Sequence, residues 1–154
     1  MKIGIISDTH GQVPNAVHDA LAGVDHILHA GDVGPMNVIT ELETLAPVSA
    51  VLGNTDYTIQ LPQMYVQTFG GQKFLVHHIV DLPVPSHLVR VAIADEQPNV
   101  VVFGHTHMPY NEHHDGVLFL NPGSASNPRG GSAPSVAIVE CNEFGLSVKV
   151  VALT

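Results

Sequence analysis

The sequence predicts an α/β fold whose first half builds a parallel sheet. Short apolar runs, rich in β-branched residues, have the length of buried strands, and segments with helical spacing separate the first three of them. A β-α-β-α-β order of this kind favours parallel strands joined by right-handed crossovers. The five runs that lead this pattern are residues 2–7, 25–30, 48–52, 73–76 and 99–103.

Three helices are expected between these strands. Pro14 fits the first turn of the first helix, because its missing N–H would be unpaired there in any case. The second helix should end before Pro47, since the residue that precedes a proline is disfavoured in the α conformation. The three helices are expected at about residues 13–21, 35–45 and 86–96.

The rest of the chain is expected to be mostly β structure. A hairpin should turn at Gly70-Gly71, where glycine permits a tight loop. The stretch 121–134 is rich in Gly, Pro and Ser and is interpreted as an ordered loop of a functional site. No repeat or linker is visible, so a single domain over residues 1–154 is predicted. The further strands are expected at residues 64–69, 72–76, 117–120, 135–141 and 146–152.

The composition limits the partners that this protein can bind. The formal net charge is −9, with 5 Lys plus Arg against 14 Asp plus Glu, which argues against non-specific binding to nucleic acid or to an anionic membrane. Only 12% of the residues are charged, about half the usual share. This low charge, with Leu146, Val148 and Val150 expected on an exposed strand face, favours a homodimer or larger homo-oligomer.

The ends of the chain and its single cysteine favour a cytoplasmic location. Cys141 has no partner within the chain, which suits a reducing compartment. The N-terminal apolar run is too short for a signal peptide and ends on Asp8. No stretch approaches the roughly 20 apolar residues of a membrane span.

Each of the five apolar runs ends on polar residues that could bind a metal ion. In an α/β sheet, ligands collect at the carboxyl ends of the strands, so these residues are expected to lie along one rim. Taken singly, each motif has a simpler interpretation as a helix cap or an Asx turn. Five such motifs at five strand ends instead predict a metal site. The predicted ligands are Asp8, His10, Asp32, Asn54, His77, His105 and His107.

The types of ligand also favour a chemistry. Carboxylate, imidazole and amide oxygen ligands without any thiolate favour a site for Mn, Fe, Zn, Co or Ni over a Cys-rich structural zinc site. Mn²⁺ is the expected ion. Two ions that share a carboxylate form a clamp suited to in-line displacement at phosphorus.

The series of motifs resembles the calcineurin-like metallophosphoesterases, and within them the small single-domain branch of YfcE-like and MJ0936-like phosphodiesterases. The resemblance runs in order from about residue 3 to residue 129 and includes Asn121-Pro122-Gly123-Ser124 and Pro128-Arg129. It implies a four-layer α/β/β/α sandwich that holds two divalent metal ions. It also implies hydrolysis of a phosphate ester, expected to be a diester, by a hydroxide that bridges the ions.

The resemblance assigns a role to each residue of the site. Asp32 would bridge the two ions, Asp56 would orient a ligand, and Arg129 would bind the substrate phosphate together with Asn54. Asp8, Asp32, Asn54 and His105 would form the catalytic group. The first ion would be held by Asp8, His10, Asp32 and His107, and the second by Asp32, Asn54, His77 and His105.

Two positions depart from the wider family. Thr55 stands where many members have a histidine that could donate a proton to the leaving group. His78 stands where many relatives have a glycine, which leaves open whether His77 or His78 binds metal; His77 follows the strand directly and is chosen. Four of the remaining histidines are expected on helix surfaces or strand edges, namely His18, His26, His29 and His87, and His113-His114 is expected in a solvated polar turn.

Two alternatives to a phosphodiesterase remain. One is a phosphomonoesterase that acts on a nucleotide or a phosphoprotein. The other is a non-catalytic scaffold like the small retromer subunit, which resembles this fold but has an altered metal site. The intact ligand series favours an enzyme with a phosphate-ester small molecule as its substrate.

Overall fold

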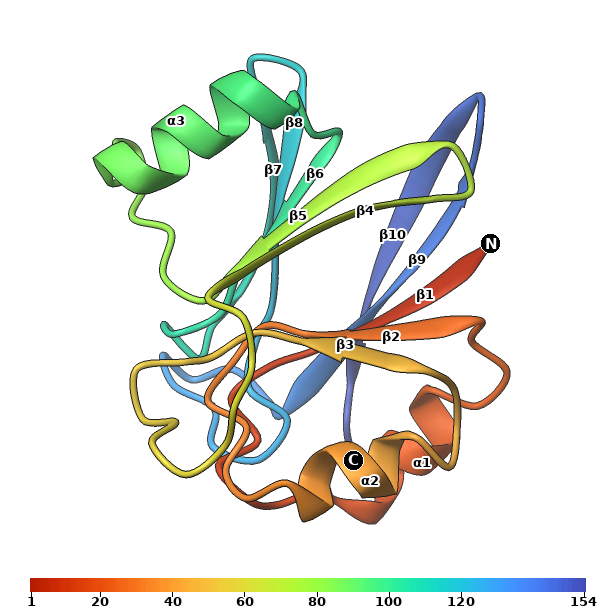
Figure 1. Ribbon diagram of the computed structural model, residues 1–154. Helices are drawn as coiled ribbons and strands as arrows, with labels where there is room; N and C mark the ends of the chain where they lie inside the picture. The colour runs from red at the N-terminus through yellow and green to blue at the C-terminus, as the bar shows by residue number, and fades with distance from the viewer.

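The computed structural model describes residues 1–154 as two five-stranded sheets packed face to face (Figure 1). The first sheet has the order β10-β9-β1-β2-β3, and the second has the order β4-β5-β6-β8-β7. The strands of the first sheet are β1 (Lys2–Ile6), β2 (His26–His29), β3 (Val48–Ala50), β9 (Ser135–Asn142) and β10 (Gly145–Ala152). Those of the second are β4 (Met64–Phe69), β5 (Gln72–His77), β6 (Val100–Val102), β7 (Pro109–His114) and β8 (Val117–Pro122).

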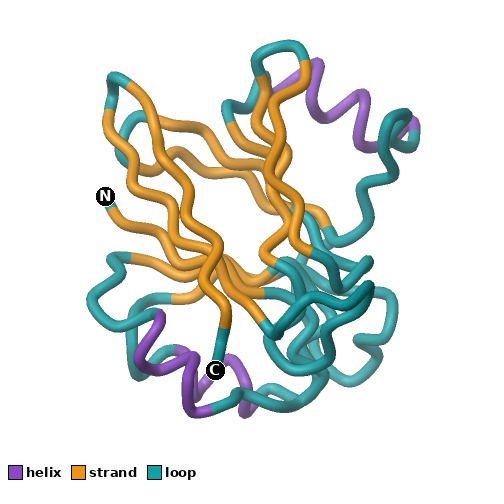
Figure 2. The backbone as a smooth tube through the Cα atoms, turned by 180° about the vertical axis from the view of Figure 1, so that it is seen from behind, coloured by secondary structure: helices purple, strands orange, loops and turns teal.

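Each sheet has a parallel centre whose strands end side by side. β1, β2 and β3 are parallel, and Ile6 at the end of β1 pairs with His29 at the end of β2. β5, β6 and β8 are also parallel, and Val76 of β5 pairs with Val102 of β6. The loops that follow these strands gather at one end of the molecule (Figure 2). The five runs predicted along one rim are therefore divided between two sheets whose loops meet.

Helices cover the outer faces of both sheets, which confirms the predicted four-layer sandwich. α1 (Asn15–Ala20) and α2 (Asn37–Leu42) pack on the first sheet, and α3 (His87–Glu96) packs on the second. Ser86 caps α3 by accepting a hydrogen bond from the Val89 amide. α1 and α2 are shorter than predicted, because turns replace their first or last residues. None of the three helices is long and apolar enough to span a membrane.

Successive residues of the central strands face two different cores. In β5, Phe74 and Val76 lie in the core between the sheets, whereas Leu75 lies in the core under α3. In β1, Ile5 faces the other sheet and Ile6 faces α1 and α2. Because both faces are apolar, these strands show continuous hydrophobic runs instead of an alternating pattern.

The one strand that the sequence did not predict is β7. Five of its six residues are exposed, and it pairs only with β8 at the edge of the second sheet. Its polar composition suits an edge strand, whose free side must resist pairing with other chains. Such a segment lacks the apolar alternation by which strands are recognised in a sequence. His113 and His114 belong to this strand and not to the polar turn that was expected.

The C-terminal hairpin does not present the apolar face that was expected. Leu146, Val148 and Val150 are half-buried and pack against the core between the sheets, while Ser147 and Lys149 point to solvent. Self-association stays a prediction, and its remaining support is the low content of charged residues.

The inter-sheet core should dominate the stability of the fold. Phe74 is completely buried between the sheets, so Phe74→Ala should lower the free energy of unfolding by about 3–5 kcal/mol. Phe144 is 91% exposed, and Phe144→Ala should change the free energy of unfolding by less than about 0.5 kcal/mol. Urea denaturation followed by circular dichroism measures both values. Equal losses in the two variants would contradict this assignment of the core.

Candidate metal centre

The loops after β1 and β2 are joined by backbone hydrogen bonds that extend the pairing of the two strands. The Asp8 amide donates to the Gly31 carbonyl at 3.0 Å, and the His10 amide donates to the Asp32 carbonyl at 3.0 Å. This pairing fixes the positions of Asp8, His10 and Asp32 relative to one another before any side chain is considered.

The backbone of the site is strained at most of the predicted ligands. Seven non-glycine residues have a positive φ, and five of them are predicted ligands. A non-glycine residue in the left-handed region costs on the order of 1–3 kcal/mol, and such residues cluster at functional sites. The bends turn side chains from two sheets toward one point. The five are Asp8, His10, Asp32, His105 and His107, with φ of 52°, 46°, 53°, 72° and 60°.

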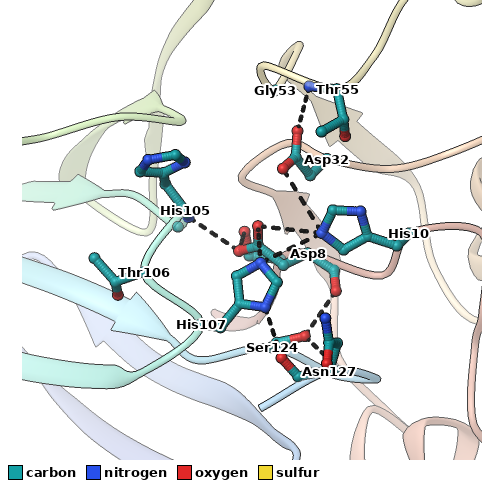
Figure 3. A network of polar contacts seen from close by, with 12 residues as sticks. Asp8, His10, Asp32, Gly53, Thr55, His105, Thr106, His107, Ser124 and Asn127 are labelled. Atoms are coloured by element: carbon teal, nitrogen blue, oxygen red, sulfur yellow. Dashed lines mark hydrogen bonds and ion pairs between the residues drawn. The ribbon is translucent and has the colours of Figure 1, made fainter. Parts of the chain in front are cut away.

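Four of the side chains form a first group that is suited to a metal ion (Figure 3). One ligand atom from each of the four lies within 4.8 Å of all the others. Asp8 Oδ1 lies 3.3 Å from His107 Nε2, and Asp32 Oδ2 lies 3.7 Å from His10 Nε2. The members are Asp8, His10, Asp32 and His107, the same four residues that the resemblance assigns to the first ion.

The hydrogen bonds of Asp8 engage one carboxylate oxygen and leave the other, which is buried, without a hydrogen-bond partner. Asp8 Oδ2 accepts from Ser7 Oγ at 2.7 Å and from the His105 amide at 3.0 Å, but the buried Oδ1 accepts no hydrogen bond. His107 Nδ1 donates to the Asn127 carbonyl at 2.6 Å, which leaves the lone pair of Nε2 facing Asp8. A buried oxygen and an imidazole lone pair that face each other need a positive charge between them. The residues therefore fit a bound metal ion.

A second group meets the first at Asp32. Asp32 Oδ2 lies 3.3 Å from His78 Nε2 and 3.7 Å from His10 Nε2, so this one oxygen is close to both groups. Asn54 Oδ1 lies 3.0 Å from His78 Nε2 and 3.0 Å from His105 Nδ1. His78 Nδ1 donates to the Ala30 carbonyl at 2.7 Å, so its Nε2 is also free to bind a metal. The second group thus consists of Asp32, Asn54, His78 and His105.

The structure places His78, and not the chosen His77, at this group. Residues of β5 alternate between the two faces of the sheet, and Phe74 and Val76 face the gap between the sheets. His78 continues that face, whereas His77 shares the opposite face with Leu75, and its Nδ1 donates to the Gln63 carbonyl at 2.9 Å. This two-residue period brings His78 to the second group in place of the predicted His77, and which of the two rings binds a metal ion stays a proposal.

Asp32 and His78 form a charge pair in the absence of metal. Burial acts to raise the pKa of Asp32, but hydrogen bonds from His78 and the Thr55 amide hold the pKa well below its usual range. Burial acts to lower the pKa of His78, but Asp32 and the charge of Asp8 raise the pKa above its usual value. A metal ion would take the place of the proton on His78, so binding should release a proton.

Comparison with known proteins identifies the family. Residues 1–143 match the model of the calcineurin-like phosphoesterase superfamily domain. The chain belongs to this superfamily.

Relatives cover almost the whole chain. A probable metallophosphoesterase of Methanothermobacter thermautotrophicus is 37% identical over 98% of this chain and 92% of its own. The phosphodiesterase MJ0936 of Methanocaldococcus jannaschii is 31% identical over 91% of this chain and 93% of its own. The crystal structure of wild-type Vps29 from Entamoeba histolytica complexed with zinc shares the fold, with a TM-score of 0.79 at 22% identity over 100% of both chains.

Two glycines of this phosphoesterase allow the carboxylates to reach their positions. A Cβ atom added at Gly104 would overlap Ser7 Oγ and lie 2.6 Å from Asp8 Oδ2. A Cβ atom added at Gly53 would overlap the amide nitrogen and Oδ1 of Asp32. Glycine is therefore required before Asn54 and before His105 because the carboxylate loops approach these two backbones closely. Backbone freedom is not the reason, since neither glycine has a positive φ.

Asp56, which the resemblance implies would orient a ligand, contacts the backbone of two loops of the site. Its carboxylate accepts hydrogen bonds from the amides of Val33 and Gly34, each at 3.1 Å, and from Gly53 at 2.8 Å. These bonds join the loop that carries Asp32 to the loop that carries Asn54.

His29 supports the site, although the sequence placed it among the surface histidines. It is fully buried, and burial lowers its pKa to about 3, so the ring is neutral. The Thr9 hydroxyl donates to the Val33 carbonyl, so His29 Nε2 donates to Thr9 Oγ1 at 2.9 Å while Nδ1 accepts from the Gly31 amide. This fixed tautomer joins the loops after β1 and β2. The sequence signal for this burial was the position of His29 in the apolar run of β2, whose residues 27–29 are all buried.

The loop that contains Asn121 supports the site from the other side. Asn121 is buried and donates to the Gly104 carbonyl and to Thr106 Oγ1, each at 3.0 Å. Ser124 Oγ donates to the Asp8 carbonyl at 2.7 Å. The Arg129 amide donates to the His107 carbonyl, and its exposed guanidinium forms no ion pair.

The other histidines lie away from the cluster. His18 contacts Glu41 between α1 and α2, and His26 contacts Ser49 between β2 and β3. Thr55 is exposed, and its amide donates to Asp32 Oδ1 at 2.9 Å.

Adding one methyl group at Gly104 should weaken metal binding. Gly104→Ala must displace Ser7 and the Asp8 carboxylate, so we expect metal affinity to fall about 10–100-fold, as for loss of a supporting contact. Gly4→Ala is the matched control, because its Cβ would approach the flexible end of Leu21 at 2.9 Å and Val24 at 3.5 Å but no residue of the cluster. Calorimetric titration of both variants with Mn²⁺ measures the affinities. Unchanged binding in Gly104→Ala would show that Asp8 does not hold the ion.

Proposed function

We propose that this protein is a phosphodiesterase that uses two divalent metal ions. The observation that carries the proposal is the buried Asp8 Oδ1 without a hydrogen-bond partner, facing the His107 lone pair beside Asp32. Asp32 Oδ2 lies between His10 and His78, which is the position that a shared ligand requires. We assign the first ion to Asp8, His10, Asp32 and His107, and the second ion to Asp32, Asn54, His78 and His105. Mn²⁺ is the proposed metal, with Zn²⁺, Fe²⁺, Co²⁺ and Ni²⁺ as alternatives.

When bound, such ions activate water and neutralise charge on the phosphoryl oxygens. The residues of the chain prepare this chemistry. The depressed pKa of Asp32 keeps its carboxylate ionised, and the bonds from His78 and His107 to backbone carbonyls fix the tautomers that present Nε2 to the site.

Two groups are available to bind the substrate phosphate. Asn54 directs Oδ1 at two imidazoles, which leaves its NH₂ group to donate to a phosphoryl oxygen. The exposed Arg129 guanidinium has no carboxylate partner and lies in the loop that is hydrogen-bonded to His107. A free guanidinium beside the site can hold a phosphate oxygen.

The charge of the site favours a diester over a monoester. A diester carries one negative charge, whereas a phosphate monoester carries about −1.5 to −2 at pH 7. Arg129 is the only cationic side chain in the loops of the site, and the chain as a whole has a net charge of −9. The curated relatives MJ0936 and YfcE, the latter from Escherichia coli, carry the name phosphodiesterase. A scaffold without catalysis would gain nothing from a buried carboxylate oxygen that lacks a partner.

The metal content of two histidine variants tests the ligand set. His78→Ala removes an imidazole from the second group and should leave close to one ion per chain, with activity reduced more than the roughly 100-fold typical of a supporting contact. His77→Ala should keep both ions, because this ring faces Gln63. Elemental analysis after dialysis gives the stoichiometry. Loss of an ion from His77→Ala with retention in His78→Ala would reverse the assignment.

Paired substrates with one leaving group test the reaction. With Mn²⁺ added, bis(4-nitrophenyl) phosphate should be hydrolysed with at least a roughly tenfold higher kcat/KM than 4-nitrophenyl phosphate, and a chelator should abolish both reactions. His18→Ala, on the helix surface, serves as the control and should behave like the wild type. Preference for the monoester would identify a phosphomonoesterase. Two bound ions without hydrolysis of either ester would favour the scaffold.

A further inference from the structure

A pocket of about 360 Å³ opens beside the second metal group. Asn54 and His78 of the second group are among its lining residues, and the others are Leu52, Gly53, Asp56, Tyr57, Gln63, His77 and Ile79. This volume lies within the range of small-molecule sites. A larger pocket of about 680 Å³ lies around Met1 and Phe144 and contains no residue of the metal cluster. The smaller pocket is therefore the one in position to receive a group attached to a bound phosphate.

An exposed aromatic ring stands at this pocket. Tyr57 is 87% exposed, and its hydroxyl forms no hydrogen bond. The segment that carries it links β3 to β4 and lies beside the loops of the site (Figure 1, in yellow). Leaving a large ring uncovered keeps apolar area in water, whereas a planar ligand can stack on it. Tyr57 is the aromatic platform of the pocket.

His77 supplies a hydrogen-bond acceptor on another side of the pocket. Its Nδ1 donates to the Gln63 carbonyl, so its Nε2 keeps a lone pair that no protein group uses.

The charge of the pocket excludes a second phosphate. No Lys or Arg lines it. The one carboxylate in its wall is Asp56, whose oxygens already accept hydrogen bonds from three backbone amides. A second phosphate would meet negative charge there, but an uncharged ring would not.

We infer that this pocket, bounded by Asn54, Tyr57, His77 and His78 and called here the ring pocket, binds one ester group of the substrate and selects a planar ring such as a nucleobase. The inference rests on the proposed function, because the phosphate must be held at the metal cluster for its ester group to reach the ring pocket. Tyr57 is the residue that determines specificity, and it does so by stacking.

Two phosphate monoesters that differ only in the attached group test the inference by binding. Thymidine 5′-monophosphate and methyl phosphate are titrated calorimetrically into the Mn²⁺-loaded wild type. We expect the nucleotide to bind roughly tenfold tighter or more, the size of a base–aromatic stacking effect. Tyr57→Ala should abolish this preference without changing the affinity for methyl phosphate, and Tyr57→Phe should retain it. Phe144→Ala, which removes an exposed ring outside the ring pocket, should behave like the wild type.

The outcomes separate the ring pocket from the proposed function. Hydrolysis of methyl 4-nitrophenyl phosphate by the wild type tests the function alone. If that diester is hydrolysed but Tyr57→Ala keeps the preference for the nucleotide, or weakens both monoesters equally, the inference is overturned and the function stands. If the diester is not hydrolysed with two ions bound, the function and the inference fail together.

Discussion

The carboxylate of Asp8 is one of the points at which the loops of the two sheets are joined. It belongs to the first sheet, but its Oδ2 accepts a hydrogen bond from the His105 amide, which follows β6 in the second sheet. The main chain around it makes further bonds to the loop after β8, since Ser124 Oγ donates to the Asp8 carbonyl and the Ala125 amide donates to the Ser7 carbonyl. The apolar core between the sheets sets their separation, while Asp8 sets the alignment of their loops. Every other residue of the cluster is positioned relative to this junction.

This arrangement gathers groups that repel one another when no cation is present. Asp8 and Asp32 bring two carboxylates into one buried site, and five residues around them have a positive φ. The fold tolerates this because Asp56, His29 and Asn121 satisfy the backbone of the loops without occupying the centre. A ligand that binds the folded chain and not the unfolded one stabilises the fold, so metal binding and folding are coupled here. A bound ion would offset the repulsion between these carboxylates.

The sequence predicted the sheets and most of the cluster because the relevant signals are local. Asp8, Asp32 and His107 each lie within four residues of the end of an apolar run, and a strand end can be identified from a single segment. The choice between His77 and His78 could not be made in that way. Both faces of β5 are apolar, since Leu75 packs under α3 while Phe74 and Val76 pack between the sheets, so the run carries no alternation that tells inside from outside. β7 and the role of His29 were missed for a related reason: one has no apolar pattern, and the other depends on Thr9 in a different loop.

The two sheets contribute donor atoms in different proportions. The first sheet and its loops supply the carboxylates of Asp8 and Asp32, the amide oxygen of Asn54 and one imidazole, His10, whereas the second sheet supplies only imidazoles, those of His78, His105 and His107. Oxygen donors alone would suit hard ions such as Mg²⁺ or Ca²⁺, and imidazole shifts the preference toward transition metals. The distance between the sheets therefore determines how many imidazole nitrogens can coordinate an ion together with the carboxylates. Packing of side chains such as Phe74 and Val102, far from any ligand, becomes a determinant of metal selectivity.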